Sequence, residues 1–232
     1  MEQPVSFRRV AVIGLGLIGG SLAWALRRSG AVGEVVGVDA SREALARAGQ
    51  RGLIDRGVAD PAEAVRGAEL VVTAVPVGSF GAVLAAAAPG LEEGALVTDV
   101  GSVKAPLLAE ARALLPEGAV FVGGHPLACT EDSGVEAAQS GLFAGALCIL
   151  TPEPSTPAWA VERVTALWHL VGSEVVTMGP QEHDRVLAAT SHLPHMLAFS
   201  LIRTFGDLED SEDLGRFAAG GFRDLTRIAG SD

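Results

Sequence analysis

Cysteine is scarce in this chain of 232 residues, which contains only Cys129 and Cys148. Two cysteines give no disulfide framework, and their scarcity is typical of proteins that work in a reducing cytoplasm. The sequence also lacks an uninterrupted apolar run long enough to span a membrane, because glycine, proline or a charged residue breaks every candidate. Its first residues lead directly into a strand pattern, without the layout of a signal peptide. We therefore expect a cytoplasmic protein with no membrane partner.

Positively charged residues are also few, since the chain has 17 Lys and Arg but 28 Asp and Glu, which gives a net charge of −11. This balance argues against nucleic acid and anionic membranes as partners. An anionic ligand would have to be held by a few local cations. Hydrophobic residues nevertheless make up 49% of the chain, and the mean hydropathy is +0.37. A parallel sheet that is buried on both faces accounts for this excess.

Residues 10–39 have the pattern of a dinucleotide-binding unit. An apolar strand pattern leads into the motif Gly-Leu-Gly-Leu-Ile-Gly at 14–19, and a helix-prone run follows. A second apolar run, 35–38, ends in Asp39, which lies 20 positions after the last glycine of the motif. The glycines, the helix start and the acidic residue occur in the order and context that binding of a dinucleotide requires.

Each part of this unit has a physical role. Gly14 permits a tight turn, Gly16 lets the backbone approach a pyrophosphate, and Gly19 allows the helix to pack closely on the strand. The helix N-terminus offers free N–H groups to the phosphates. Asp39 can accept hydrogen bonds from the ribose hydroxyls and would repel a 2′-phosphate, which favours NAD over NADP. Arg42 is near enough to receive such a phosphate, so that NADP stays the alternative.

The rest of the chain alternates short β-rich runs with alanine-rich helical runs, which predicts an α/β fold with a doubly wound, Rossmann-type sheet. Near residue 178 this rhythm stops. We predict a first domain over 1–178 and a smaller, all-helical and incomplete domain over 179–232, with a long helix at 181–205 kinked by Pro194 and an acidic connector at 206–213. The expected strands are 10–13, 35–38, 70–74, 96–100, 120–122, 148–150 and 174–177, and the expected helices include 41–50, with Ser41 as N-cap, 79–88, 104–115 and 157–171.

Two strand ends carry candidate catalytic side chains. Ser102 follows the strand at 96–100, where it can serve a ligand or merely cap the next helix. His125 lies in Gly-Gly-His-Pro at 123–126, a sequence that predicts a rigid turn presenting the histidine at the sheet edge. A histidine near its natural pKa suits proton abstraction at neutral pH.

Two further groups lie in the predicted helical domain. His192 and His195 are three positions apart and share a helix face. A metal site is disfavoured, because the chain has no His-Glu-x-x-His motif and no cysteine pairing, so we interpret both histidines as lining a cleft between domains. Arg223 and Arg227 could grip a carboxylate or could belong to a solvated basic helix face.

Taken together, these motifs resemble the prephenate/arogenate dehydrogenase family, the oxidoreductases of tyrosine biosynthesis. The resemblance extends over nearly the whole chain, and the order of the later motifs is specific to the family. The matching segments are 14–21, 99–104, 123–128, Glu131 with 133–136, 183–185, 191–195 and 221–228.

The resemblance implies a homodimer and a role for each candidate. His125 would be the catalytic base, and Ser102 would orient it and the ring hydroxyl of the substrate. Arg227 would hold a substrate carboxylate, with Glu131 at the mouth of the pocket. The remaining substrate-binding candidates are His192, His195 and Gly220, and the cofactor-binding candidates are Gly14, Gly16, Leu17, Ile18, Gly19, Asp39, Arg42, Val75 and Pro76.

The implied reaction is the oxidative decarboxylation of prephenate. The carbinol carbon loses a hydride to NAD, His125 takes the hydroxyl proton, and the ring carboxylate departs as CO2 while the ring becomes aromatic. Prephenate is a dianion, so Arg227 must create a local positive field in an acidic protein.

Two features depart from the family pattern. Cys129 stands where the family usually has glycine. The chain also stops at 232, where family members continue with more helix, so we expect either a truncated or a naturally short form, with consequences for dimer strength and full activity.

Three alternatives remain from the sequence. Arogenate could replace prephenate as the substrate. The chain could be a dinucleotide-binding regulatory protein without chemistry, although the set of Ser102, His125 and Arg227 argues against it. A dehydrogenase of the β-hydroxyacid type is disfavoured, because such enzymes use a lysine in the helical domain and the chain has only Lys104, in the first domain.

Overall fold

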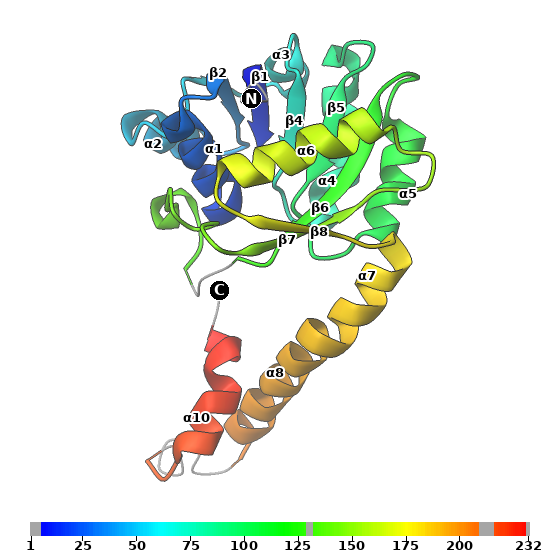
Figure 1. Ribbon diagram of the computed structural model, residues 1–232. Coiled ribbons are helices and arrows are strands. Elements are labelled where there is room, and N and C mark those ends of the chain that lie inside the picture. The colour runs from blue at the N-terminus through cyan, green and yellow to red at the C-terminus, as the bar shows by residue number, and fades with distance from the viewer. Residues whose placement is uncertain (1–5, 129–131, 209–215, 231–232) are drawn as a thin grey trace.

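A computed structural model describes residues 6–128, 132–208 and 216–230 and shows a twisted sheet with helices on both faces (Figure 1). Within these residues the sheet has eight strands in the order β3-β2-β1-β4-β5-β6-β7-β8. The first six strands are parallel and follow the Rossmann order, which confirms the predicted fold class. The strands are β1 Phe7–Ile13, β2 Val32–Val38, β3 Arg56–Val58, β4 Leu70–Thr73, β5 Leu96–Asp99, β6 Val120–Pro126, β7 Leu147–Thr151 and β8 Glu174–Thr177.

Helices cover both faces of this sheet, and the sheet separates the core into two layers. The layer under α1 and α6 contains Leu22, Leu26 and Trp168, and the layer under α4 and α5 contains Phe80 and Leu107. The helices of this part are α1 Leu17–Ser29, α2 Arg42–Gln50, α3 Pro61–Val65, α4 Phe80–Ala87, α5 Ala105–Leu114 and α6 Ala158–Leu170, with 3-10 turns at Val77–Ser79, Ala88–Gly90 and Val135–Ala137.

The prediction for residues 123–126 was wrong, because this segment is strand and not a turn. β6 continues through Pro126 and pairs antiparallel with β7, so that His125 lies opposite Ile149. The two glycines of the segment allow this close pairing. A Cβ atom on Gly123 would come within 2.5 Å of Oγ1 of Thr151, and one on Gly124 within 2.8 Å of the carbonyl oxygen of Asp99.

After β8 the chain continues into a helical part that extends away from the sheet (Figure 1). Helix α7 (Pro180–Leu187) passes through a π-helical turn (Ala188–His192) into α8 (Leu193–Gly206). Pro194 lies in the first turn of α8, so the irregularity predicted there takes the form of this π turn. Most of the predicted acidic connector falls outside the described residues.

The last described segment packs against α8. It consists of α10 (Gly220–Thr226) and a 3-10 turn (Arg227–Gly230), and Figure 1 shows it running back toward the sheet. The rings of Phe205 and Phe222 lie 4.8 Å apart and join the two helices. No helix of the described part is long and apolar enough to cross a membrane.

Candidate active site

The glycine loop between β1 and α1 has the geometry that its motif predicts. Gly14 has a φ of +94°, and a Cβ there would lie 2.3 Å from the carbonyl oxygen of Ala74. A Cβ on Gly19 would lie 1.9 Å from the carbonyl oxygen of Gly14, so this position requires glycine for helix packing. At Gly16 a Cβ would meet no atom within 4 Å, and no side chain caps the helix that begins beside it. The open space and the uncapped helix N-terminus fit a pyrophosphate.

Asp39 ties this loop to the next helix. One carboxylate oxygen accepts a hydrogen bond from the backbone N–H of Leu15 at 2.8 Å, and the other accepts one from the N–H of Ser41 at 2.8 Å. A carboxylate accepts about four hydrogen bonds, so acceptor sites remain for ribose hydroxyls. Ser41 caps α2 as predicted, since its hydroxyl accepts a hydrogen bond from the N–H of Ala44 at 3.2 Å.

The other cofactor-binding candidates surround this loop. Leu17 and Ile18 are half-buried in the first turn of α1, and Arg42 is exposed at the start of α2. Val75 follows β4, and its Cγ1 would be 3.0 Å from a Cβ on Gly14. Pro76, the next residue, is exposed.

A buried ion pair lies behind the carboxyl end of β5. The ammonium of Lys104 is hydrogen-bonded to Asp99 and, at 2.6 Å, to the carbonyl oxygen of Gly124, and both charged side chains are only 1% exposed. The carboxylate of Asp99 also accepts the N–H groups of Gly101 at 2.7 Å and Gly124 at 3.1 Å. Burial raises the pKa of Asp99 and lowers that of Lys104, while their mutual attraction opposes both shifts. The pair fixes the loop that carries Ser102 to the strand that carries His125.

The interpretation of Ser102 as a helix cap is wrong. Helix α5 begins after Lys104, and no side chain from its own N-cap bonds to it. Instead, the carboxylate of Asp184, on α7, accepts the N–H groups of Lys104 at 2.7 Å and Ala105 at 2.9 Å. Ser102, an exposed residue, is therefore not the N-cap of this helix.

His125 is half-buried and contacts a second histidine. Its Nδ1 lies 2.8 Å from Nε2 of His183, and the two rings meet edge to face with centroids 5.1 Å apart. The Nδ1 of His183 lies in turn 2.8 Å from a carboxylate oxygen of Asp184. Burial, followed by the charge of Lys104, lowers the pKa of His125 to about 3. The expectation of a pKa near the natural value was therefore wrong, because it left burial out of account, and the imidazole is neutral at pH 7.

The remaining predicted substrate residues lie on the helical part. His192 ends the π turn and is half-buried. His195 lies one turn further, with Nδ1 2.9 Å from the carbonyl oxygen of Ser191. Gly220 begins α10, and Arg227 begins the 3-10 turn that follows, where both are exposed.

Two of the residues singled out in the sequence, Cys129 and Glu131, lie outside the described residues. Within the described chain, no three histidine, cysteine, aspartate or glutamate side chains are grouped to hold a metal ion.

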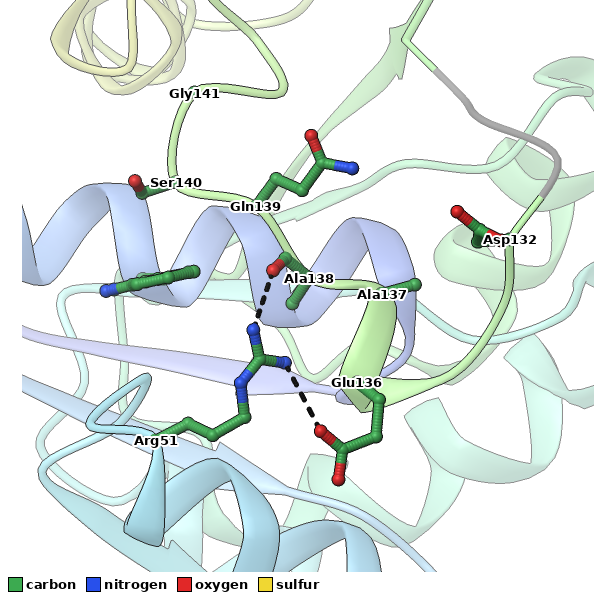
Figure 2. A pocket seen from close by; sticks show the side chains of 9 residues that line it. Arg51, Asp132, Glu136, Ala137, Ala138, Gln139, Ser140 and Gly141 are labelled. Carbon is green, nitrogen blue, oxygen red and sulfur yellow. Dashed lines mark hydrogen bonds and ion pairs between the residues drawn. The ribbon is translucent and has the colours of Figure 1, made fainter.

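The segment after β6 is anchored to the dinucleotide-binding half beside a separate pocket (Figure 2). The guanidinium of Arg51 donates to the carbonyl oxygens of Val135 and, at 3.0 Å, Ala138, and it lies 5.4 Å from the ring centre of Trp24. Figure 2 shows the same side chain paired with Glu136. None of the predicted site residues lines this pocket of about 540 Å³.

The fold and the glycine loop define a dinucleotide-binding protein of the α/β class. Residues 22–177 match the family described as prephenate dehydrogenase, nucleotide-binding domain, and residues 179–232 match prephenate dehydrogenase, dimerization domain. The chain belongs to the prephenate dehydrogenase family, as its motifs suggested.

Similar proteins include a cyclohexadienyl dehydrogenase as well as prephenate dehydrogenases. A cyclohexadienyl dehydrogenase of Zymomonas mobilis is 40% identical over 97% of this chain and 78% of its own length. A prephenate dehydrogenase of Bacillus subtilis is 41% identical over 96% of this chain, which spans 60% of that relative's length.

Solved structures agree with this relationship. A prephenate dehydrogenase of Aquifex aeolicus, in complex with hydroxyphenyl propionate and NAD+, superposes with a TM-score of 0.90 at 38% identity, covering 99% of this chain and 80% of that chain. An arogenate dehydrogenase of Synechocystis superposes with a TM-score of 0.81 at 32% identity, covering 97% and 80%.

Proposed function

We propose that this chain catalyses the NAD-dependent oxidative decarboxylation of prephenate to 4-hydroxyphenylpyruvate, a step of tyrosine biosynthesis. The observation that carries this proposal is the neutral, half-buried imidazole of His125 near the carboxyl end of β6. The parallel strands β1 and β2 place the glycine loop and Asp39 at this same edge of the sheet. A base and a dinucleotide site at one edge are what a dehydrogenase needs. Membership in the prephenate dehydrogenase family supports this assignment.

In this proposal, His125 accepts the proton of the substrate's ring hydroxyl. The pKa of His125 is lowered by burial to about 3, below the natural value expected from the sequence, and it keeps the imidazole unprotonated and able to accept a hydrogen bond from this hydroxyl. The hydroxyl of Ser102, exposed on a loop held by the Lys104–Asp99 pair, orients the substrate oxygen. The ring carboxylate then leaves as CO2, and aromatisation supplies much of the driving force.

The glycine loop and Asp39 fit NAD. The free space at Gly16 and the uncapped start of α1 would hold the pyrophosphate, and Asp39 would bind the ribose. Leu17, Ile18 and the segment at 75–76 would line the same site. When bound, NAD supplies the acceptor for the electrons of the carbinol carbon.

The helical part would complete the substrate site and the dimer. We propose that Arg227 binds a substrate carboxylate, that His192 and His195 line the pocket with Gly220, and that the functional boundary lies at residue 178. Exposed apolar side chains such as Met196 and Leu197 on α8, 63% and 62% exposed, support a homodimer through the part that matches the dimerization domain. The cytoplasmic location stays a prediction from the scarcity of cysteine, and cell fractionation would test it.

Arogenate dehydrogenation is the second candidate. It is favoured by the similarity to the Synechocystis arogenate dehydrogenase and to the Zymomonas cyclohexadienyl dehydrogenase. Arogenate has an amine where prephenate has a keto group, and the chemistry at the ring is the same.

The test is NADH formation by the purified chain with NAD and either prephenate or arogenate. We expect turnover with prephenate that exceeds turnover with arogenate. Faster turnover with arogenate would reverse the order of the two candidates. No turnover with either substrate, in a chain that still binds NAD, would support the regulatory alternative and contradict the proposal.

A further inference from the structure

We propose that His183 and Asp184 are positioning residues that hold the imidazole of His125 in a single tautomer, with its proton on Nδ1 and the lone pair on Nε2. The inference rests on the proposed function, in which His125 is the base. The three side chains form a continuous chain of contacts, each 2.8 Å long.

Asp184 determines which group donates and which accepts in these two hydrogen bonds. Its carboxylate faces the backbone N–H groups of Lys104 and Ala105 and the Nδ1 of His183. These hydrogen bonds lower the pKa of Asp184 against the opposing effect of burial, so the carboxylate is ionised and can only accept hydrogen bonds. The Nδ1 of His183 must therefore carry a proton.

The state of His183 then determines that of His125. The side chain of His183 is fully buried, and burial lowers its pKa, so the ring is neutral and carries one proton only. With that proton on Nδ1, its Nε2 is an acceptor, and the hydrogen bond must be donated by Nδ1 of His125. The Nε2 of His125 is left without a proton and can take one from a substrate hydroxyl.

The opposite arrangement is costly. If Nε2 of His183 donated to His125, either His183 would be a buried cation in the field of Lys104, or its unprotonated Nδ1 would face the Asp184 carboxylate at 2.8 Å. Each case adds an unfavourable electrostatic interaction that the proposed arrangement avoids.

Asp184 also connects these hydrogen bonds to the fold. By capping α5 with its carboxylate, Asp184 fixes α7 against the loop that carries Ser102. Helix α7 therefore places the acceptor His183 beside His125 on β6, which lies 58 positions earlier in the sequence.

The test is the ¹⁵N NMR spectrum of the full chain with labelled histidine, with the His125 signals assigned by their loss in His125→Asn. We expect a protonated Nδ1 and an unprotonated Nε2 for His125. A protonated Nε2 in the wild-type chain would overturn the proposal, and this readout needs no variant of His183 that folds.

Two substitutions of His183 add a kinetic readout. In His183→Phe the acceptor is lost, and we expect a mixture of His125 tautomers and a kcat about 10–100-fold lower with NAD affinity unchanged. In His183→Gln the amide oxygen can accept the bond, and we expect one tautomer and partial recovery of kcat. His169→Gln, on α6 and outside the site, is the control.

The outcomes separate the two proposals. An unchanged tautomer and kcat in His183→Phe would refute the positioning role while leaving His125 as the base. If the wild-type chain shows the expected tautomer but turns over neither substrate, the proposed function is refuted. The assignment of donors and acceptors among His125, His183 and Asp184 then still holds.

Discussion

Replacing Lys104 by methionine tests whether the buried ion pair behind the site is a structural requirement. The substitution keeps an unbranched side chain of similar size but removes the ammonium that contacts Asp99 and the carbonyl oxygen of Gly124. Asp99, 1% exposed, would keep the N–H groups of Gly101 and Gly124 as donors and lose the ammonium that is its counter-ion.

Breaking a buried pair from one side costs about 3–5 kcal/mol. In a chain of this size each kcal/mol lowers the melting temperature by roughly 2–4 °C, so we expect a decrease of roughly 6–20 °C. The loss of stability should be smaller at acid pH. Without Lys104 the pKa of folded Asp99 rises further above its unfolded value, so the folded state binds the proton more strongly and is favoured as the pH falls.

The assay is thermal unfolding followed by circular dichroism, with Arg112→Met as the matched control. Arg112 pairs with Glu153 at the surface, where its side chain is 63% exposed, and its loss should cost less than about 1 kcal/mol. Adding Asp99→Asn to Lys104→Met should recover part of the lost stability, because the buried charge is removed. Equal melting temperatures for Lys104→Met and Arg112→Met would refute the reasoning.

Four further predictions follow from the same structure. In Gly19→Ala the new Cβ would lie 1.9 Å from the carbonyl oxygen of Gly14, so we expect a loss of about 1–3 kcal/mol and weaker NAD binding, measured by denaturation and fluorescence titration; wild-type values for both would contradict this packing. Asp39→Ala should reduce the preference for NAD over NADP in steady-state kinetics, and an unchanged ratio would show that the ribose is bound elsewhere. Arg227→Ala should raise the KM for prephenate through loss of about 2–5 kcal/mol, and an unchanged KM would remove Arg227 from the substrate site. Because His125 has a pKa of about 3 when folded and an ordinary value of 6.5 when unfolded, the unfolded chain takes up the proton first as the pH falls from 6.5 toward 3. Stability should then fall by up to roughly 1.4 kcal/mol per pH unit, and His125→Asn should weaken this dependence in denaturant titrations; an identical dependence in the variant would contradict the low pKa.

Local sequence patterns were enough to predict most of the fold. Apolar runs such as 35–38 and the glycine motif at 14–19 can be recognised from neighbouring residues alone. The strand predicted at the first and the tight strand-to-helix turn predicted at the second are confirmed. Strand β3 was missed because Arg-Gly-Val at 56–58 has no apolar run, and it forms only by pairing with the end of β2. The extension of β6 to Pro126 was missed because it depends on an antiparallel partner, β7, some twenty residues further on.

Candidate site residues could be proposed from the sequence where the residue type and its position suggest a chemical role. His125 and Asp39 were proposed in this way, and their roles stay predictions. The supporting contacts were not, because they join distant or individually unremarkable residues. Asp184 caps a helix that begins 79 positions earlier, at Ala105, and nothing local to either residue indicates it. Lys104 and Asp99 have the charges of a surface pair, and only the packing of β5 and β6 around them shows that the pair is buried.

The most direct test of the account is the turnover of His125→Asn with NAD and prephenate, measured beside NAD binding by the same preparation. Asparagine preserves polarity but cannot take up the hydroxyl proton. The account predicts unchanged NAD affinity and a kcat lower by roughly two or more orders of magnitude. A kcat near that of the wild-type chain would contradict the assignment of His125 as the base.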